Sequence, residues 1–161
     1  MVAGVGSAAF ECQIGNGSIQ VIGLLALTVA AVFTGAAFYV GFAEQPARLT
    51  LDDRELLAEW KPAYRRGTAM QAPLAIVGCV FGIGAWWLTG HALFLIGAIL
   101  LGANWPWTFL AIMPTNRVLM ATDLRQAGPT SRALIRRWNT LHSVRTALGS
   151  LSTLAFLIAL S

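Results

Sequence analysis

Four long apolar runs dominate this chain and leave few options for its fold. They cover about residues 19–43, 67–89, 91–113 and 141–160. Each run is near the roughly 20 residues that a helix needs to cross the hydrocarbon layer of a membrane. Helices are favoured because every backbone N–H and C=O group must find its partner inside the spanning segment. The sequence therefore predicts an all-α integral membrane protein, an antiparallel four-helix bundle in a lipid bilayer.

The composition supports a single membrane domain. Of the 161 residues, 57% are hydrophobic and 11% are charged, whereas a soluble domain carries roughly 25% charged residues. We expect this domain to cover residues 18–161, preceded by a flexible leader over residues 1–17 that is rich in Gly, Ser and Ala. The leader has no basic segment, so the first run is interpreted as a retained helix and not as a cleaved signal.

The basic residues predict the orientation in the membrane. Ten of the eleven Lys and Arg residues lie in two segments, 44–66 and 114–141, that an even number of crossings places on the same side. The positive-inside rule makes that side cytoplasmic and puts both termini on the other side of the cell (inner) membrane. This bias accounts for the net charge of +4, so we expect no nucleic-acid partner.

Both charged segments are predicted to be partly helical. Thr50 is a candidate N-cap for a helix over about residues 49–60 that Pro62 ends. In the second segment, Thr130 or Ser131 begins a helix that continues into the fourth run.

The third run contains two prolines and two tryptophans within ten residues. Pro106 is expected to kink the helix, and Pro114 to end it. Trp105 and Trp107 have two interpretations: they line a pocket for a flat aromatic ligand, or they anchor the helix at the membrane interface.

Polar residues inside the runs converge on one layer. Counted at about 1.5 Å per residue, each lies between the cytoplasmic boundary, where His142 is placed, and roughly two turns inside its helix. The residues of this layer are Tyr39, Gln71, Asn104, Thr108, His142 and Arg145.

The charged residue of this layer, Arg145, needs an explanation because a cation inside a membrane is costly. It either pairs with Glu44, bridged by Asn104 or Gln71, or extends to the headgroups. His142 has the pKa range suited to proton transfer, and it is either a base or a structural residue.

Cysteine and histidine provide no cofactor site. Cys12 and Cys79 lie far apart and have no metal-ligand spacing. His91 and His142 are predicted at opposite membrane faces, so we expect no haem, no metal and no other cofactor.

Several segments together resemble a known family. They are Phe38-Tyr39-x-x-Phe42 followed by Pro46, Asn104…Pro106, Ile112-Met113-Pro114-Thr115-Asn116-Arg117-x-Leu119, and Trp138-x-x-x-His142-x-x-Arg145. In order and spacing they are similar to the anthrone oxygenase-like family of small four-helix membrane proteins. The resemblance implies an oxygenase that acts on a lipophilic aromatic molecule, anthrone- or hydroquinone-like, with dioxygen and no cofactor.

For such chemistry we assign His142 as the base, Tyr39 or Asn104 as the residue that orients it, and Arg145 as the stabiliser of the oxyanion. The expected substrate-binding residues are Trp105, Trp107, Thr108, Gln71, Phe42 and Trp138. The alternative is a non-catalytic membrane subunit or small-molecule binding protein. The sequence leaves open whether the chain associates with a second copy or with a membrane partner.

Overall fold

The structure, a computed structural model, describes the backbone of residues 5–161 and the side chains of residues 20–161. The predicted leader over residues 1–17 and Cys12 lie outside the part with described side chains. The leader therefore stays a prediction.

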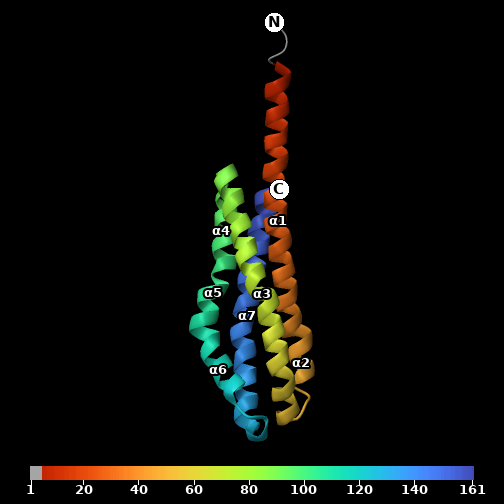
Figure 1. The fold of residues 1–161 in the computed structure, drawn as a ribbon, viewed down its shortest axis with the longest axis vertical. Helices are drawn as coiled ribbons and strands as arrows, with labels where there is room; N and C mark the ends of the chain where they lie inside the picture. Colours follow the sequence, from red (N-terminus) through yellow and green to blue (C-terminus); the bar gives the residue numbers. More distant parts are fainter. Residues whose placement is uncertain (1–4) are drawn as a thin grey trace.

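Four antiparallel helical spans form one elongated bundle (Figure 1), which confirms the predicted all-α fold. Between residues 5 and 161 the structure contains helices and connecting turns and no strand. The elements are α1 (Val5–Tyr39), the π-helical turn η1 (Val40–Glu44), α2 (Gln45–Arg48), α3 (Asp53–Thr89), α4 (Ala92–Gly102), α5 (Asn104–Trp107), the π-helical turn η2 (Thr108–Ile112), α6 (Met113–Ala121), the 3₁₀ turn η3 (Leu124–Gln126) and α7 (Pro129–Leu160).

The spans are longer than the apolar runs that predicted them. The segments long and apolar enough to cross a membrane are Gln20–Arg48, Asp53–Thr89, Ala92–Ala121 and Pro129–Leu160. Each extends past its apolar run into the charged segments, so the bundle has an apolar end and a charged end. This arrangement is consistent with a multi-pass protein in a lipid bilayer.

A tight turn joins α3 to α4 at the apolar end. Gly90 closes α3 with φ 71°, a left-handed conformation that glycine adopts without steric cost. Its N–H donates to the carbonyl of Trp86 at 2.7 Å. The chain then reverses within two residues and enters α4.

The start of α3 differs from the prediction. Asp52, and not Thr50, is the N-cap, and its carboxylate accepts from the N–H groups of Arg54 and Glu55 at 2.9 and 2.8 Å. Pro62 does not end the helix, which continues through Pro62 and Pro73 to Thr89. Leu56, Leu57 and Trp60 are fully buried on the turn before Pro62, and this packing outweighs the hydrogen bond that the proline removes.

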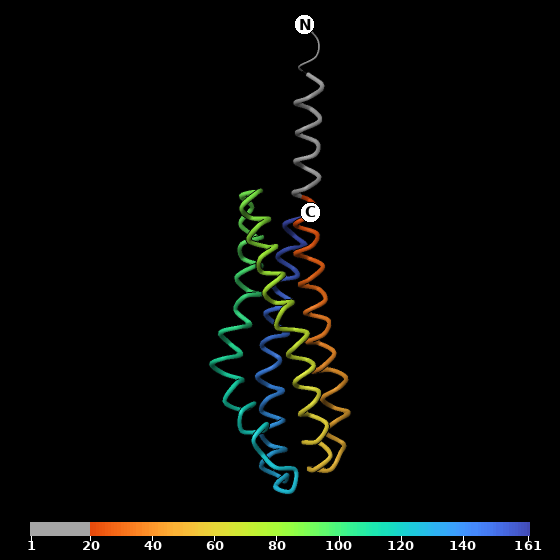
Figure 2. Tube along the Cα trace, in the orientation of Figure 1, coloured from red at the N-terminus to blue at the C-terminus, as the bar shows by residue number. Residues whose placement is uncertain are grey.

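The third span is interrupted before Pro106, where α4 ends at Gly102 and α5 begins at Asn104. This agrees with the expected kink, and Figure 2 shows the chain path bending along this span. Pro114, however, does not end the span. It lies in the first turn of α6, where a missing N–H costs nothing, and the helix continues to Ala121.

Glycines bring the helices into close contact at the apolar end. A Cβ atom at Gly82 would lie 2.6 Å from Phe156 Cζ, and one at Gly97 would lie 2.5 Å from Phe156 Cε1. Three helices therefore meet around one phenylalanine ring, in the small-residue packing typical of membrane bundles.

The charged end is held together by side chains that cap its loops. Arg132 forms an ion pair with Asp53 and donates to the carbonyls of Leu49 and Leu51 at 2.9 and 2.5 Å. The long helix α7 runs without interruption into the fourth span, as predicted. It is capped at Gly128, whose N–H donates to Ser131 Oγ at 3.0 Å.

Candidate functional site

A cavity of about 210 Å³ lies inside the bundle, toward its charged end. Its wall comes from all four spans and combines apolar side chains with a polar set. The lining residues are Val40, Glu44, Arg48, Ala63, Tyr64, Gly67, Thr68, Gln71, Ala72, Ala75, Asn104, Trp105, Thr108, Phe109, Ile112, Met113, Asn116, Trp138, His142 and Arg145.

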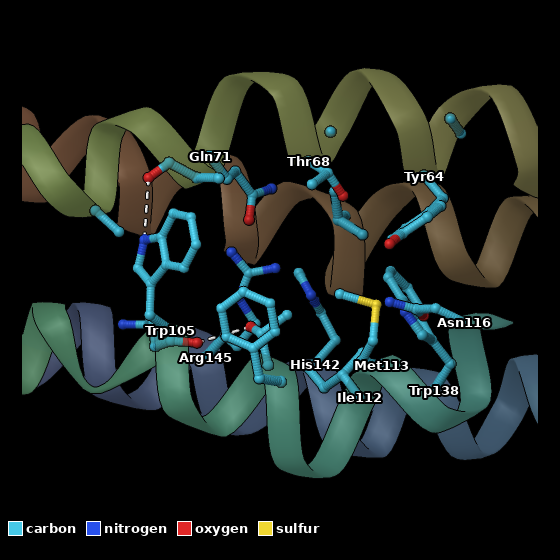
Figure 3. A pocket seen from close by; sticks show the side chains of 18 of the residues that line it. Tyr64, Thr68, Gln71, Trp105, Ile112, Met113, Asn116, Trp138, His142 and Arg145 are labelled. Carbon is cyan, nitrogen blue, oxygen red and sulfur yellow. Dashed lines mark hydrogen bonds between the residues drawn. The ribbon is translucent and has the colours of Figure 1, made fainter.

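The polar residues of the wall lie at successive depths (Figure 3). On α3 the order from the charged end is Tyr64, Thr68, Gln71, and on α7 it is Trp138, His142, Arg145. Both helices leave the charged end, so equal spacing of four and then three residues keeps the two sets level. The third span runs the other way and places Asn116 nearer the charged end and Asn104 deeper.

We call Gln71, Asn104 and Arg145 the deep level. Gln71 and Asn104 are each 2% exposed. The Asn104 amide group donates to the carbonyl of Leu101 at 3.0 Å, but Asn104 Oδ1, Gln71 Oε1 and Arg145 Nε are buried without a hydrogen-bond partner. Buried polar atoms without partners are costly, and their concentration on one cavity wall favours a polar ligand group at this depth.

His142 lies between the deep level and the charged end and is 2% exposed. Its Nε2 atom is 3.2 Å from the carbonyl oxygen of Ala37 on α1. A carbonyl only accepts hydrogen bonds, so the neutral ring carries its proton on Nε2. Nδ1 therefore has a free lone pair, and this atom is buried without a partner.

The predicted pair of Arg145 with Glu44 is wrong. Glu44 forms an ion pair with Arg48, four residues along the same helical segment, and Arg48 Nε also lies 2.9 Å from Glu59. Among the residues with described side chains, Arg145 takes part in no salt bridge. Its guanidinium carbon lies 5.5 Å from the centre of the Phe33 ring, a cation–π contact that compensates only partly for a missing counter-ion.

Most of the predicted site residues line this one cavity. They are Gln71, Asn104, Trp105, Thr108, Trp138, His142 and Arg145. Trp105 donates from Nε1 to the carbonyl of Ala72 at 3.3 Å, and Thr108 Oγ1 donates to the carbonyl of Asn104 at 2.7 Å.

Three predicted site residues lie elsewhere. Tyr39 is 61% and Phe42 72% exposed on the outer face of the first span, and neither lines the cavity. The reason is rotational: depth along a helix does not determine which face a residue occupies. Trp107 packs among the buried side chains near the charged end and donates from Nε1 to the carbonyl of Leu141 at 3.0 Å.

The sequence reasoning missed Tyr64, Thr68 and Asn116 as lining residues. Asn116 follows Pro114, where the helix was expected to end, so it was assigned to a loop. Two signals find these residues. Tyr64 and Thr68 lie seven and three residues before Gln71 and therefore share its face of α3, and Asn116 lies on the helix that continues beyond Pro114.

Two π-helical turns flank the cavity. η1 contributes Val40 and Glu44 to its wall, and η2 contributes Thr108, Phe109 and Ile112. Each turn ends two residues before a proline, at Glu44 before Pro46 and at Ile112 before Pro114. Such turns change the direction of the following side chains and are frequent at functional sites.

More than half of the chain matches a known protein family. The family model for anthrone oxygenase matches residues 60–155. The chain belongs to the anthrone oxygenase family. The matched residues include every lining residue from α3 to α7, and only Val40, Glu44 and Arg48 fall outside the match.

A related protein is described as an anthrone oxygenase from Claviceps purpurea (strain 20.1). It is 26% identical over 140 residues, which cover 78% of this chain and 80% of that relative. No solved structure matches the chain. Membership of the anthrone oxygenase family makes an oxygenase-like function the natural starting point for the site described above.

Within the part of the chain that has described side chains, no group of three or more His, Cys, Asp or Glu residues is arranged to hold a metal ion. The polar groups that the cavity offers for chemistry include His142, Arg145 and the amides of the deep level.

Proposed function

We propose that this chain is a membrane-embedded, cofactor-independent oxygenase of lipophilic aromatic substrates that are anthrone- or hydroquinone-like. The single observation that carries the proposal is the free Nδ1 atom of His142, in the same cavity as the unpaired cation of Arg145. A base and a positive charge are the two groups that deprotonation of an aromatic carbon or oxygen acid requires.

His142 is the base. The hydrogen bond from Nε2 to Ala37 fixes the tautomer and the ring orientation, and Trp138 stacks on the ring with centroids 4.9 Å apart. A fixed ring costs no reorganisation when the proton is transferred. Asn104 was predicted to orient His142, but the Ala37 carbonyl does so. Asn104 instead orients the substrate, since its Oδ1 is buried and unpartnered.

Arg145 stabilises the anion that deprotonation creates. It lies three residues after His142 on α7, so both side chains project from the same face of the helix. In a cavity shielded from water, a positive charge lowers the energy of a developing oxyanion more than it would in solution.

With an anthrone as the substrate, His142 removes one proton of its benzylic CH₂ group, and the resulting anion gives an electron to dioxygen. The two radicals combine to form a C–O bond, and the peroxide takes up a proton. Loss of water, with the second benzylic proton, leaves a ketone, so that CH₂ and O₂ become C=O and H₂O. Dioxygen is the oxidant, and no other reductant or oxidant takes part.

The membrane supplies both reactants. Thr68 on α3 and Phe109 on η2 line the cavity and are also exposed on the outside of the bundle. They mark a side opening through which an apolar molecule enters from the bilayer. The basic segments at this end favour a cytoplasmic location for it in the cell (inner) membrane, with both termini on the opposite side.

Oxygen uptake by the purified full chain, measured with a panel of anthrones and hydroquinones, tests this proposal. His142→Ala and His142→Gln should lower turnover by roughly 10²- to 10⁴-fold, the usual contribution of a general base. His91→Ala is the matched control, since His91 lies in the exposed turn at the apolar end, and it should leave turnover unchanged. Unchanged turnover in both His142 variants contradicts the proposed base. No oxygen uptake by the natural chain with any compound of the panel would favour a non-catalytic binding protein.

A further inference from the structure

The cavity has a second polar region that the proposed chemistry does not use. It consists of Tyr64, Asn116 and Trp138, which we call the loop-end level because it lies nearer the charged end than His142 (Figure 3). Tyr64 comes from α3, Asn116 from α6 and Trp138 from α7.

Asn116 is the least explained polar residue of the cavity wall. It is 2% exposed, and both its Nδ2 and its Oδ1 atoms are buried without a hydrogen-bond partner. An amide so placed loses its hydration and gains nothing in return, which is unfavourable for each atom. A residue that serves packing alone would be apolar here, so the amide indicates that a polar group of a ligand binds to it.

A second unpartnered donor lies in the same level. Trp138 Nε1 is also buried without a partner, and the Tyr64 hydroxyl points toward Asn116 (Figure 3). Together the two residues offer two donor atoms, Asn116 Nδ2 and Trp138 Nε1, and one acceptor atom, Asn116 Oδ1. A phenolic hydroxyl has one O–H donor and two acceptor lone pairs, so it complements this set.

The surrounding side chains form a rigid aromatic wall. Trp60 stacks on Tyr64 with ring centroids 5.1 Å apart, and it meets Trp138 edge-on at 5.8 Å. Stacked and edge-to-face pairs hold these rings in fixed orientations. The polar atoms of the loop-end level are therefore prearranged, and binding does not have to order them.

The spacing of the two polar levels sets the size of the ligand. Tyr64 and Gln71, and likewise Trp138 and Arg145, are seven residues apart within continuous α-helix. Seven residues rise by about 10 Å. That distance is close to the length of a fused three-ring aromatic skeleton and exceeds that of a single ring.

We propose that the loop-end level binds a phenolic hydroxyl on the outer ring of the substrate, while Arg145 and the deep level hold its oxyanion. Asn116 is then a specificity-determining residue, because its amide selects ligands that carry a hydroxyl group on an outer ring. The inference rests on the proposed function for the aromatic nature of the ligand, but it is tested by binding and not by turnover.

Quenching of tryptophan fluorescence in the purified full chain measures this binding. The probes are two unreactive ligands, 9,10-anthraquinone and 2-hydroxyanthraquinone. We expect the natural chain to bind the hydroxylated ligand about tenfold more tightly, the usual effect of one or two well-placed hydrogen bonds. Asn116→Leu should remove this preference by weakening only the hydroxylated ligand.

Asn139→Leu is the matched control. Asn139 lies next to Trp138 and has a buried, unpartnered Oδ1, but it does not line the cavity. The same chemical change at this position should leave the tenfold preference intact. Tyr64→Phe, which removes only a hydroxyl, should lower the preference by about threefold and replaces Asn116→Leu if that variant does not fold.

Three results overturn the inference: equal binding of the two ligands by the natural chain, a preserved preference in both Asn116→Leu and Tyr64→Phe, or a preference lost equally in Asn139→Leu. Binding with the expected preference but without oxygen uptake from any anthrone keeps the inference and rejects the oxygenase. Oxygen uptake without the binding preference rejects the inference and keeps the oxygenase.

Discussion

The two ends of the bundle follow opposite packing rules. At the apolar end, Phe156 fills the space that Gly82 and Gly97 leave, and the buried hydroxyl of Ser152 donates to the carbonyl of Gly97 at 2.7 Å. Among the residues with described side chains, every buried side-chain nitrogen or oxygen atom without a hydrogen-bond partner lies at the deep level or nearer the charged end. The apolar end is therefore closely packed, and its buried hydroxyl group is hydrogen-bonded. The charged end keeps a cavity and buried polar atoms without hydrogen-bond partners.

The difference assigns a role to each end. Close packing around small residues stabilises a membrane bundle, where the hydrophobic effect contributes little between helices. Buried polar atoms without partners are destabilising and persist where they serve binding or catalysis. The apolar end thus holds the four spans together, while the charged end holds the candidate site. The predictions that follow test this division.

The largest expected effect on stability belongs to Phe156. Phe156→Ala leaves a void where three helices meet and should lower the free energy of unfolding by about 3 kcal/mol. Oxygen uptake should stay within about threefold of the natural chain, because Phe156 lies three turns beyond Arg145 on α7. Denaturant titration in detergent, followed by circular dichroism, gives the first quantity.

Leu157→Ala is the control for this prediction. Leu157 is the next residue and lies exposed on the outside of the bundle, so it should cost less than about 1 kcal/mol. Equal losses for the two variants, or a loss of activity in Phe156→Ala without unfolding, would mean that the two ends are not independent.

At Arg145 we expect a substitution to raise the stability of the protein and to lower its activity. Arg145→Met removes an unpaired charge from the membrane and should raise the free energy of unfolding by about 1 kcal/mol. It should also lower turnover by roughly 10²- to 10³-fold, as the loss of one oxyanion-stabilising group does. Arg145→Lys keeps the charge and should recover part of the turnover. A destabilised Arg145→Met variant with normal oxygen uptake would show that the arginine is structural.

The fold was largely predictable from hydrophobicity. Runs of about 20 apolar residues located all four spans, because a membrane permits few alternatives to a helix. Local proline rules failed at Pro62 and Pro114, where the helices continue. At Pro62 the burial of Trp60 on the preceding turn keeps the helix intact, and at Pro114 a π-helical turn ends just before the proline. A single sequence does not show which of these tertiary contacts will outweigh a local preference.

The sequence predicted how deep the candidate site residues lie in the membrane, but not which face of its helix each residue occupies. Counting residues from the helix ends placed Gln71, Asn104, His142 and Arg145 at one depth, and the structure brings them to one cavity. Tyr39 was placed at the same depth and lies outside. Its helix had no polar periodicity to indicate a face. The π-helical turn that begins at Val40 rotates only the residues after it, such as Phe42.

The smallest expected effect concerns that same residue. Tyr39→Phe removes a hydroxyl that is exposed on the outer face of the first span and makes no hydrogen bond among the described residues. We expect turnover within about twofold and a change in unfolding free energy below about 0.5 kcal/mol. Oxygen-uptake kinetics and the same denaturant titration measure both. A loss of turnover above tenfold, with KM unchanged, would return Tyr39 to the catalytic group. It would also show that the first span turns its outer face inward when substrate binds, so that the division between the two ends would no longer describe the working protein.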